Sequence, residues 1–211
     1  SVMEQCPFVM LSGVGADAFA REQGLETKDP SFFFTQRRWD DLQRAKASEA
    51  AAGEVWDPES RPNTVDLPEE EDPGRTGTVG AVALDPRGRL VAGTSTGGSA
   101  NKKWGRIGDS PVIGAGTYAG SHCGVSCTGW GEYFIRNAVA FDIQARMAYR
   151  GLTLREACAE VILEVLEAQR TGLGGVVALD RDGNVEICFN TRGMYRGWVD
   201  EEGRIEVAIF D

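Results

Sequence analysis

Three short, glycine-rich clusters carry the residues of this chain that could do chemistry. They are GTSTGG at residues 93–98, GRIGDSP at 105–111 and CTGWGE at 127–132. Glycine neighbours permit a ligand to approach the backbone closely and leave N–H groups free to point at it. We expect all three clusters at strand ends, although glycine clusters alone could also be simple strand turns.

The second cluster holds a pair of opposite charges, Arg106 and Asp109. Together they could bind a zwitterion, because a guanidinium suits a carboxylate and a carboxylate suits an ammonium. The competing interpretation is an ordinary salt bridge between these two residues within a turn.

The chain offers little to catalysis based on histidine. His122 is its only histidine and lies in an alternating strand pattern, so we expect a packed or edge residue without a chemical role. The Gly-x4-Gly-Lys-Ser/Thr pattern of a phosphate-binding loop is absent. Cys123 and Cys127 are four residues apart, but with one histidine in the chain a zinc site would lack ligands.

A threonine can act without histidine when its own α-amino group is the base. That amine has a pKa of about 7.7–8.0, close to working pH. The threonine must then be the first residue of a chain, so the peptide bond before it has to be cut. The run EEEDPGRTGTVGAVALD passes from acidic residues to Gly77 and Thr78 and then into a strand pattern. The bond between Gly77 and Thr78 is therefore where a new terminus would matter.

One segment carries most of the formal charge of −10. Between Glu49 and Arg75, nine acidic residues and two arginines contribute −7, and four prolines interrupt the segment. This composition is typical of a disordered linker, which we place at about residues 40–77. The rest of the chain is nearly neutral, so nucleic acid is not an expected partner.

Cysteine usage and hydropathy indicate the compartment. The five cysteines (Cys6, Cys123, Cys127, Cys158, Cys188) are odd in number and lack the spacing of a disulfide framework. We expect reduced, mostly buried thiols. No basic and apolar leader opens the sequence and no apolar run reaches 18 residues, so we expect a cytoplasmic protein without a membrane span.

The elements that must position these clusters read as strands and then helices. Two pairs of β-rich runs surround turn signals, at 78–96 around DPRG and at 174–191 around RDG. Residues 111–120 and 122–132 are also strand-like, and residues 31–52 have a helical pattern.

Two further helices are expected between the strand pairs. The first spans Tyr133–Arg150, and the second spans Leu154–Arg170 with Thr153 and Glu156 as a capping box and Gly172 as the stop. At 211 residues and 42% hydrophobic composition, this order predicts one layered α+β domain with an antiparallel sheet.

Four stretches together resemble a known family. GTVGAVALD, TSTGG with NKKWGRIGDSPVIGAGTYA, SCTGWGE and FNTRGMYRGW are similar to the Thr-type N-terminal-nucleophile hydrolases of the plant-type asparaginase and isoaspartyl peptidase family. The likeness covers nearly all of residues 78–198, and residues 2–25 resemble the later part of the family's α-subunit. The Thr-Gly-Gly and Thr-Gly-x-Gly-Glu forms resemble the asparaginase branch more than the glycosylasparaginase branch.

The resemblance implies self-cleavage between Gly77 and Thr78. Thr78 would then be the nucleophile and, through its amine, the base, while Thr96 would hydrogen-bond its hydroxyl. Arg106 and Asp109 would bind the α-carboxylate and the α-amine of the substrate.

The resemblance also implies the remaining parts of the site and the fold. Thr128 and Gly129 would supply the oxyanion hole, and Gly131 would add a backbone contact to the substrate. The fold would be an αββα sandwich in which residues 1–77, the later α-subunit, and residues 78–211, the β-subunit, form one domain. Cleaved αβ units would pair into an (αβ)2 assembly, and Glu132 would brace the helix that follows it.

The implied activity is hydrolysis of the side-chain amide of L-asparagine and of β-aspartyl dipeptides. No organic cofactor is implied, and the family loop that binds a structural Na⁺ or K⁺ would precede Ser1, so no metal ligands are expected here. One alternative is an uncleaved, truncated relative that binds small amino acids or pairs with a longer homologue without catalysis. Another is a related threonine peptidase that acts on protein substrates.

Overall fold

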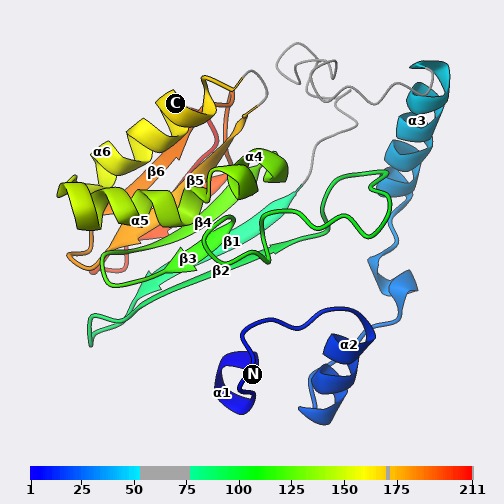
Figure 1. Cartoon of the computed structure of the whole chain (residues 1–211), viewed down its shortest axis with the longest axis horizontal. Helices are drawn as coiled ribbons and strands as arrows, with labels where there is room; N and C mark the ends of the chain where they lie inside the picture. Colours follow the sequence, from blue (N-terminus) through cyan, green and yellow to red (C-terminus); the bar gives the residue numbers. More distant parts are fainter. Residues whose placement is uncertain (53–76, 170–171, 211) are drawn as a thin grey trace. The chain divides into compact units, whose positions relative to one another are not determined.

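The computed structural model describes residues 1–52, 77–169 and 172–210 (Figure 1). The chain divides into two compact units, Ser1–Gln43 and Arg44–Asp211. This partition does not test the expected division at Gly77, which is a predicted point of cleavage.

The first unit consists of short helices. They are α1 (Val2–Gln5), α2 (Gly13–Glu22), the 3-10 helix η1 (Pro30–Phe33) and the beginning of α3 (Gln36–Ala52). Neither α1 nor α2 has a buried residue, so the large apolar side chains of this unit lie at its surface. The predicted helical character of this region is confirmed. The linker expected at about 40–77 is helical as far as Ala52, and residues 53–76 lie outside the described residues.

In the described residues of the second unit, the strands form three antiparallel groups. The first is the pair β1 (Thr78–Leu84) and β2 (Leu90–Thr96). The second is a sheet in the order β3 (Thr117–Ala119), β4 (Cys123–Gly129), β5 (Gly174–Asp180) and β6 (Val185–Phe189). The third is the pair β7 (Arg196–Val199) and β8 (Ile205–Ala208). The fold is therefore mixed α+β with antiparallel sheets, as the sequence predicts.

The same aspartate-closed turn joins three strand pairs. In each turn the carboxylate accepts hydrogen bonds from the backbone amides two and four residues further on; the aspartates are Asp85, Asp180 and Asp200. Three residues after each aspartate a glycine adopts a positive φ, a conformation that residues with a Cβ rarely take. The repeated Val-Ala-Leu-Asp predicts the first two turns, whereas the third shares only the Asp-x-x-Gly spacing.

The helix predicted over Tyr133–Arg150 is two helices, so that prediction is wrong. α4 covers Gly131–Arg136 and α5 covers Val139–Arg150, with Ala138 between them at a left-handed φ of 46°. The first turn of α5 takes partners from elsewhere, because the amides of Ala140 and Phe141 donate to the carbonyls of Ala115 and Gly114. The first amides of a helix have no partner within the helix, and these contacts supply one. Because the partners are distant in the sequence, the periodicity of apolar residues does not reveal these contacts.

The next helix begins at the predicted residue. Thr153 and Glu156 form the expected capping box before α6 (Leu154–Ala159). The helix then widens into the π-helix η3 (Glu160–Leu166), which ends before the predicted Arg170. Among the described residues, no helix is both long and apolar enough to cross a bilayer.

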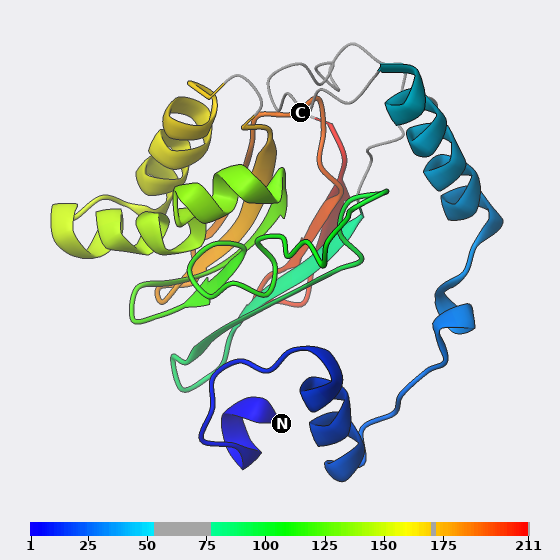
Figure 2. The same ribbon diagram turned by 45° about the vertical axis from the view of Figure 1, so that its right-hand side comes forward.

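The side chains of β4 alternate between the two faces of the β3–β6 sheet. Cys123, Val125 and Cys127 are buried in one core cluster with side chains of α4, α5 and α6. Ser126, on the other face, contacts the β1–β2 pair. The helices and the β1–β2 pair thus lie on opposite faces of this sheet (Figure 2).

A glycine lets β1 lie directly against β4. A Cβ on Gly80 would be only 2.0 Å from Ser126 Oγ. The Ser126 hydroxyl shares a hydrogen bond of 2.6 Å with Thr94 Oγ1, which also donates to the Gly116 carbonyl at 3.0 Å. These contacts anchor the hairpin on the sheet.

The same contacts fix how β1 runs across β4. Gly80 lies against Ser126, and the Cβ position of Gly124 lies 3.7 Å from Val82 Cγ1. The two strands therefore cross in opposite directions, and Thr78 and Thr128 each lie two residues beyond the contact of Gly80 with Ser126, toward the same end of the two strands.

We predict that Gly80→Ala destabilises the protein by about 1–3 kcal/mol, because the new methyl group overpacks the contact with Ser126. The second change Ser126→Gly makes room, so Gly80→Ala should cost less in that background. The free energy of unfolding is measured by urea denaturation. The matched control is Gly93→Ala on β2, where a Cβ meets no atom within 4 Å. Equal stability of the two single alanine variants would contradict the prediction.

Candidate active site

The first part of the site is a pair of threonine hydroxyls. Thr78 begins β1 and lies opposite Thr96, the last residue of β2. Thr78 Oγ1 donates to Thr96 Oγ1 at 3.4 Å, and Thr96 Oγ1 accepts from the amide of Gly98 at 3.1 Å. The structure thus brings together the two threonines that the resemblance pairs. The hydroxyl contact is long, as contacts at catalytic groups often are before a ligand binds.

The carbonyl of the predicted cleavage point belongs to the same cluster. Thr96 Oγ1 donates to the Gly77 carbonyl oxygen at 3.4 Å. One hydroxyl therefore contacts both sides of the bond between Gly77 and Thr78, and this contact follows from the strand register.

The second part of the site is an ion pair between Arg106 and Glu132, which differs from the competing interpretation of a salt bridge between Arg106 and Asp109. Arg106 Nε donates to Glu132 Oε1 at 2.9 Å, and Arg106 Nη2 donates to Glu132 Oε2 at 2.8 Å. Hydrogen bonds to Glu132 are the main cause of a raised Arg106 pKa, which burial opposes. The turn salt bridge between Arg106 and Asp109 is therefore not formed. Glu132 lies in the first turn of α4, where a negative charge suits the helix dipole, although no side chain of the described residues caps this helix by a hydrogen bond.

Asp109 is buried without a full set of partners. The residue is only 6% exposed, and its Oδ2 has no hydrogen-bond partner among the described residues. Burial raises the Asp109 pKa; its own backbone amide and Arg106 lower it, and Glu132 raises it further. A buried polar atom without a partner is costly, so it indicates a ligand that brings a donor.

Glycines bring these charged groups together. A Cβ on Gly131 would be 2.7 Å from Asp109 Oδ1 and 3.0 Å from Arg106 Nη2. A Cβ on Gly116 would be 2.7 Å from Asp109 Oδ2, and one on Gly108 would be 2.7 Å from Arg106 Nη1. Larger residues at these positions would fill the space beside both charges, so the structure unites Arg106, Asp109 and Gly131 as expected.

The third part of the site is the end of β4. Thr128 comes two residues after Ser126, the residue that lies against Gly80 of β1, and Gly129 follows it with a φ of 150°. A Cβ on Gly129 would lie 2.5 Å from the carbonyl oxygen of Leu173. Gly131, which contacts Arg106 and Asp109, is two residues further on. Arg106, Asp109 and Glu132 form what we call the charged group. The end of β4 therefore leads from the layer that contacts β1 to the charged group.

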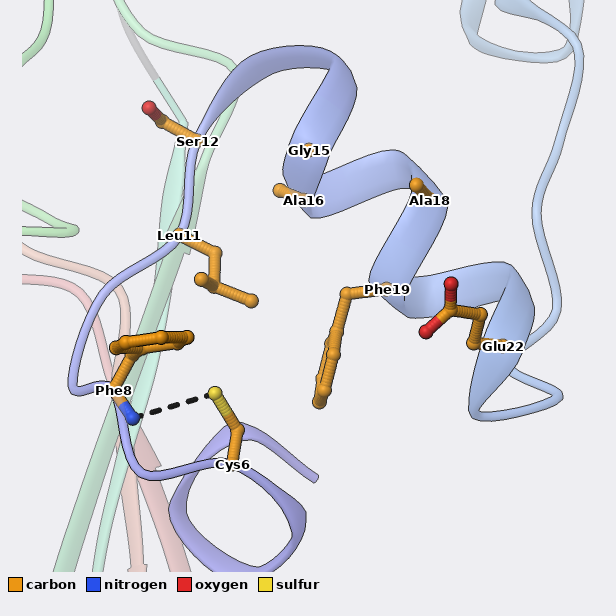
Figure 3. A pocket seen from close by; sticks show the side chains of 9 residues that line it. All are labelled: Cys6, Phe8, Leu11, Ser12, Gly15, Ala16, Ala18, Phe19 and Glu22. Atoms are coloured by element: carbon orange, nitrogen blue, oxygen red, sulfur yellow. Dashed lines mark hydrogen bonds between the residues drawn. The ribbon is translucent and has the colours of Figure 1, made fainter.

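A hollow of about 270 Å³ lies in the first unit (Figure 3). Its apolar side chains Phe8, Leu11 and Phe19 gather around it, and the Phe8 amide donates to Cys6 Sγ at 3.4 Å. The full lining is Cys6, Phe8, Leu11, Ser12, Gly15, Ala16, Ala18, Phe19 and Glu22. None of the predicted site residues belongs to it, so we assign this hollow no catalytic role.

The remaining reactive side chains lie apart from the threonine pair. His122 Nδ1 shares a hydrogen bond of 2.9 Å with Ser121 Oγ. All five cysteines are free, as predicted, and burial raises the pKa of Cys123 to about 12, so its thiol stays protonated. In the described part of the chain, no group of three or more His, Cys, Asp or Glu side chains could hold a metal ion.

Comparisons with known proteins show the family to which this chain belongs. A family model described as asparaginase matches residues 1–209, and the chain belongs to this family. It is 50% identical over 198 residues to the isoaspartyl peptidase of Escherichia coli strain K12, covering 93% of this chain and 58% of that protein.

Two further relatives come from other branches of life. The putative isoaspartyl peptidase/L-asparaginase of Dictyostelium discoideum is 43% identical, with 100% of this chain and 67% of that protein covered. The plant-type L-asparaginase of Pyrococcus furiosus is 36% identical, with 95% and 63% covered. The chain thus spans 58% to 67% of the length of these three relatives.

The raised pKa of Asp109 gives a prediction about pH. A carboxyl group whose pKa is raised by folding contributes most to stability when it is protonated, and this contribution is lost as the pH rises. An asparagine side chain cannot ionise, so the melting temperature of Asp109→Asn minus that of the wild type should rise between about pH 4 and pH 7. Thermal unfolding across this range measures the difference.

The control for this prediction is Asp85→Asn. Folding lowers the pKa of Asp85, mainly through a hydrogen bond from the amide of Arg89. The contribution of this carboxylate is complete above about pH 4 and is lost only below it. The melting temperature of this variant, relative to the wild type, should therefore stay level between about pH 4 and pH 7. The same trend with pH in both variants would refute the account of Asp109.

Proposed function

We propose that this chain is the catalytic part of an amidohydrolase that cleaves the side-chain amide of L-asparagine and the β-peptide bond of β-aspartyl dipeptides. The observation that carries the proposal is the Thr78–Thr96 hydroxyl pair at a strand start, bonded to the Gly77 carbonyl. The names of the relatives, isoaspartyl peptidase and L-asparaginase, support the substrate class.

The first step is self-cleavage of the bond between Gly77 and Thr78. Thr78 Oγ attacks the Gly77 carbonyl carbon, the C–N bond breaks, and an ester replaces the peptide bond. The Thr96 hydroxyl donates to the Gly77 carbonyl oxygen and stabilises the negative charge that develops there. Water then hydrolyses the ester, which leaves a carboxylate on Gly77 and a free amine on Thr78.

Substrate binding uses the charged group. The unpaired Asp109 carboxylate accepts the α-ammonium, and Arg106 donates to the α-carboxylate. Gly131 lies against both residues, so the backbone there can contact the bound substrate. This arrangement leaves the β-amide pointing away from the charged group, toward Thr78.

Hydrolysis follows by acyl transfer through Thr78. Its free amine accepts the proton of its own hydroxyl, and Oγ attacks the β-carbonyl carbon of the substrate. Thr128 and Gly129 hold the negative charge on the carbonyl oxygen; loss of one such donor costs about 10²–10³ in rate. Ammonia or an amino acid leaves with the proton, and water hydrolyses the resulting ester to release aspartate and restore Thr78.

The assembly around this site is also a proposal. We propose an αββα sandwich, in which a helical layer covers the outer face of β1 and β2. The exposure of Val79 (71%) and Val91 (53%) on these strands supports it. Cleaved αβ units pair into a homo-oligomer, and the five free thiols suit the reducing cytoplasm.

We predict that Thr78→Ala abolishes both cleavage and hydrolysis. Intact-mass measurement of the denatured wild type should give fragments of residues 1–77 and 78–211, whereas the variant should remain a single 22.8 kDa chain. Hydrolysis of L-asparagine and of a β-aspartyl dipeptide should fall by about 10³-fold or more, since the nucleophile is lost.

The control is Thr78→Ser, which keeps a hydroxyl and should still cleave and turn over. Undiminished hydrolysis in Thr78→Ala would sink the proposed function. An intact wild-type chain that binds L-aspartate without turnover would instead support the non-catalytic alternative.

A further inference from the structure

The guanidinium of Arg106 has two edges that can each bind a carboxylate, and Glu132 occupies only one of them. A guanidinium can grip a carboxylate through Nε and Nη2 or through Nη1 and Nη2. Glu132 occupies the first edge, with contacts of 2.9 and 2.8 Å. The second edge lies beside the glycines 108 and 131, where a Cβ would come within 2.7 Å of Nη1 and 3.0 Å of Nη2. A small carboxylate can therefore reach that edge.

The orientation of Arg106 explains why Asp109 lacks a partner. The two residues are three positions apart, and each affects the pKa of the other by Coulomb attraction. The two hydrogen bonds to Glu132 fix the orientation of the guanidinium, and in this orientation Asp109 Oδ2 receives no hydrogen bond from it. An arginine without Glu132 would be free to turn toward the buried carboxylate and pair with it.

Glu132 also changes the charge that a ligand meets. Arg106, Asp109 and Glu132 together carry −1 when all three are ionised. A ligand with a carboxylate and no ammonium would place a second carboxylate on the guanidinium and leave Asp109 unpaired. An ammonium on the ligand pairs Asp109 and offsets this repulsion.

We propose that Glu132 is a positioning residue that keeps Asp109 open and makes the site demand an ammonium group on its ligand. This inference rests on the proposed function for the placement of the substrate. The site then takes amides that carry both an α-carboxylate and an α-ammonium. It rejects the same amide without the amino group, succinamate.

The test compares Glu132→Gln with the wild type on L-asparagine and succinamate. The variant keeps the size of the side chain and loses its charge, so Arg106 is released toward Asp109. We expect KM for L-asparagine to rise about tenfold with kcat changed less than about threefold, because ground-state binding is lost. The ratio of kcat/KM for L-asparagine to that for succinamate should fall by at least about tenfold.

Two variants separate this role from general support of the fold. Glu132→Asp keeps the charge, so its ratio between the two amides should stay nearer the wild type than that of Glu132→Gln. Glu164→Gln, an exposed change on η3, should alter neither KM nor the ratio. Equal ratios in Glu132→Gln and the wild type would overturn the proposal.

Binding measurements keep the proposal independent of turnover. Calorimetric titration of L-aspartate and succinate into each protein gives the preference for the ammonium directly. If the wild type hydrolyses nothing but prefers L-aspartate, and Glu132→Gln loses that preference, the proposed function fails and the role of Glu132 stands. If the wild type binds L-aspartate no better than succinate, the role of Glu132 is refuted.

Discussion

The close approach of β1 to β4 is the constraint on which the rest of the site depends. Gly80 has no side chain, so the strand can lie against Ser126, whose hydroxyl binds Thr94. Alternation along the strand then places Thr78, two residues before Gly80, on the same face of β1. Since Thr78 also pairs with Thr96 in the hairpin, its position is fixed by two independent sets of contacts. A side chain held in this way needs no loop to orient it.

The charged group follows a different rule, because its arrangement costs free energy in the absence of a ligand. Asp109 is buried with one oxygen unpaired, and its nearest cation is held by Glu132. Proteins retain such costs at sites where a ligand later supplies the missing partner. This cost falls close to the core. Burial, and then the charge of Asp109, raise the pKa of the thiol of Cys127, which belongs to the core cluster.

The sequence predicts the elements better than it predicts contacts between distant residues. Strand alternation and the Val-Ala-Leu-Asp repeat predict β1, β2, β5 and β6, since both signals are local. The break at Ala138 is not predicted, because the amides of α5 bind carbonyls more than twenty residues away. Likewise Arg106 and Asp109 read as one local pair, although the partner of Arg106 lies 26 residues further on. The Glu that ends Thr-Gly-x-Gly-Glu was the available signal, and its role required the structure.

These two ways of positioning residues have a consequence for how the site can vary. The threonine pair depends on strand register, where a shift of one residue would turn the side chains to the other face. The charged group depends on the loop at 105–111 and on the first turn of α4, where single side chains can change without moving a strand. In the proposed function, changes in the ligand that the site accepts therefore need not disturb Thr78. The position of Thr78 depends on the sheet, whereas the proposed binding of the ligand depends on the residues around Arg106.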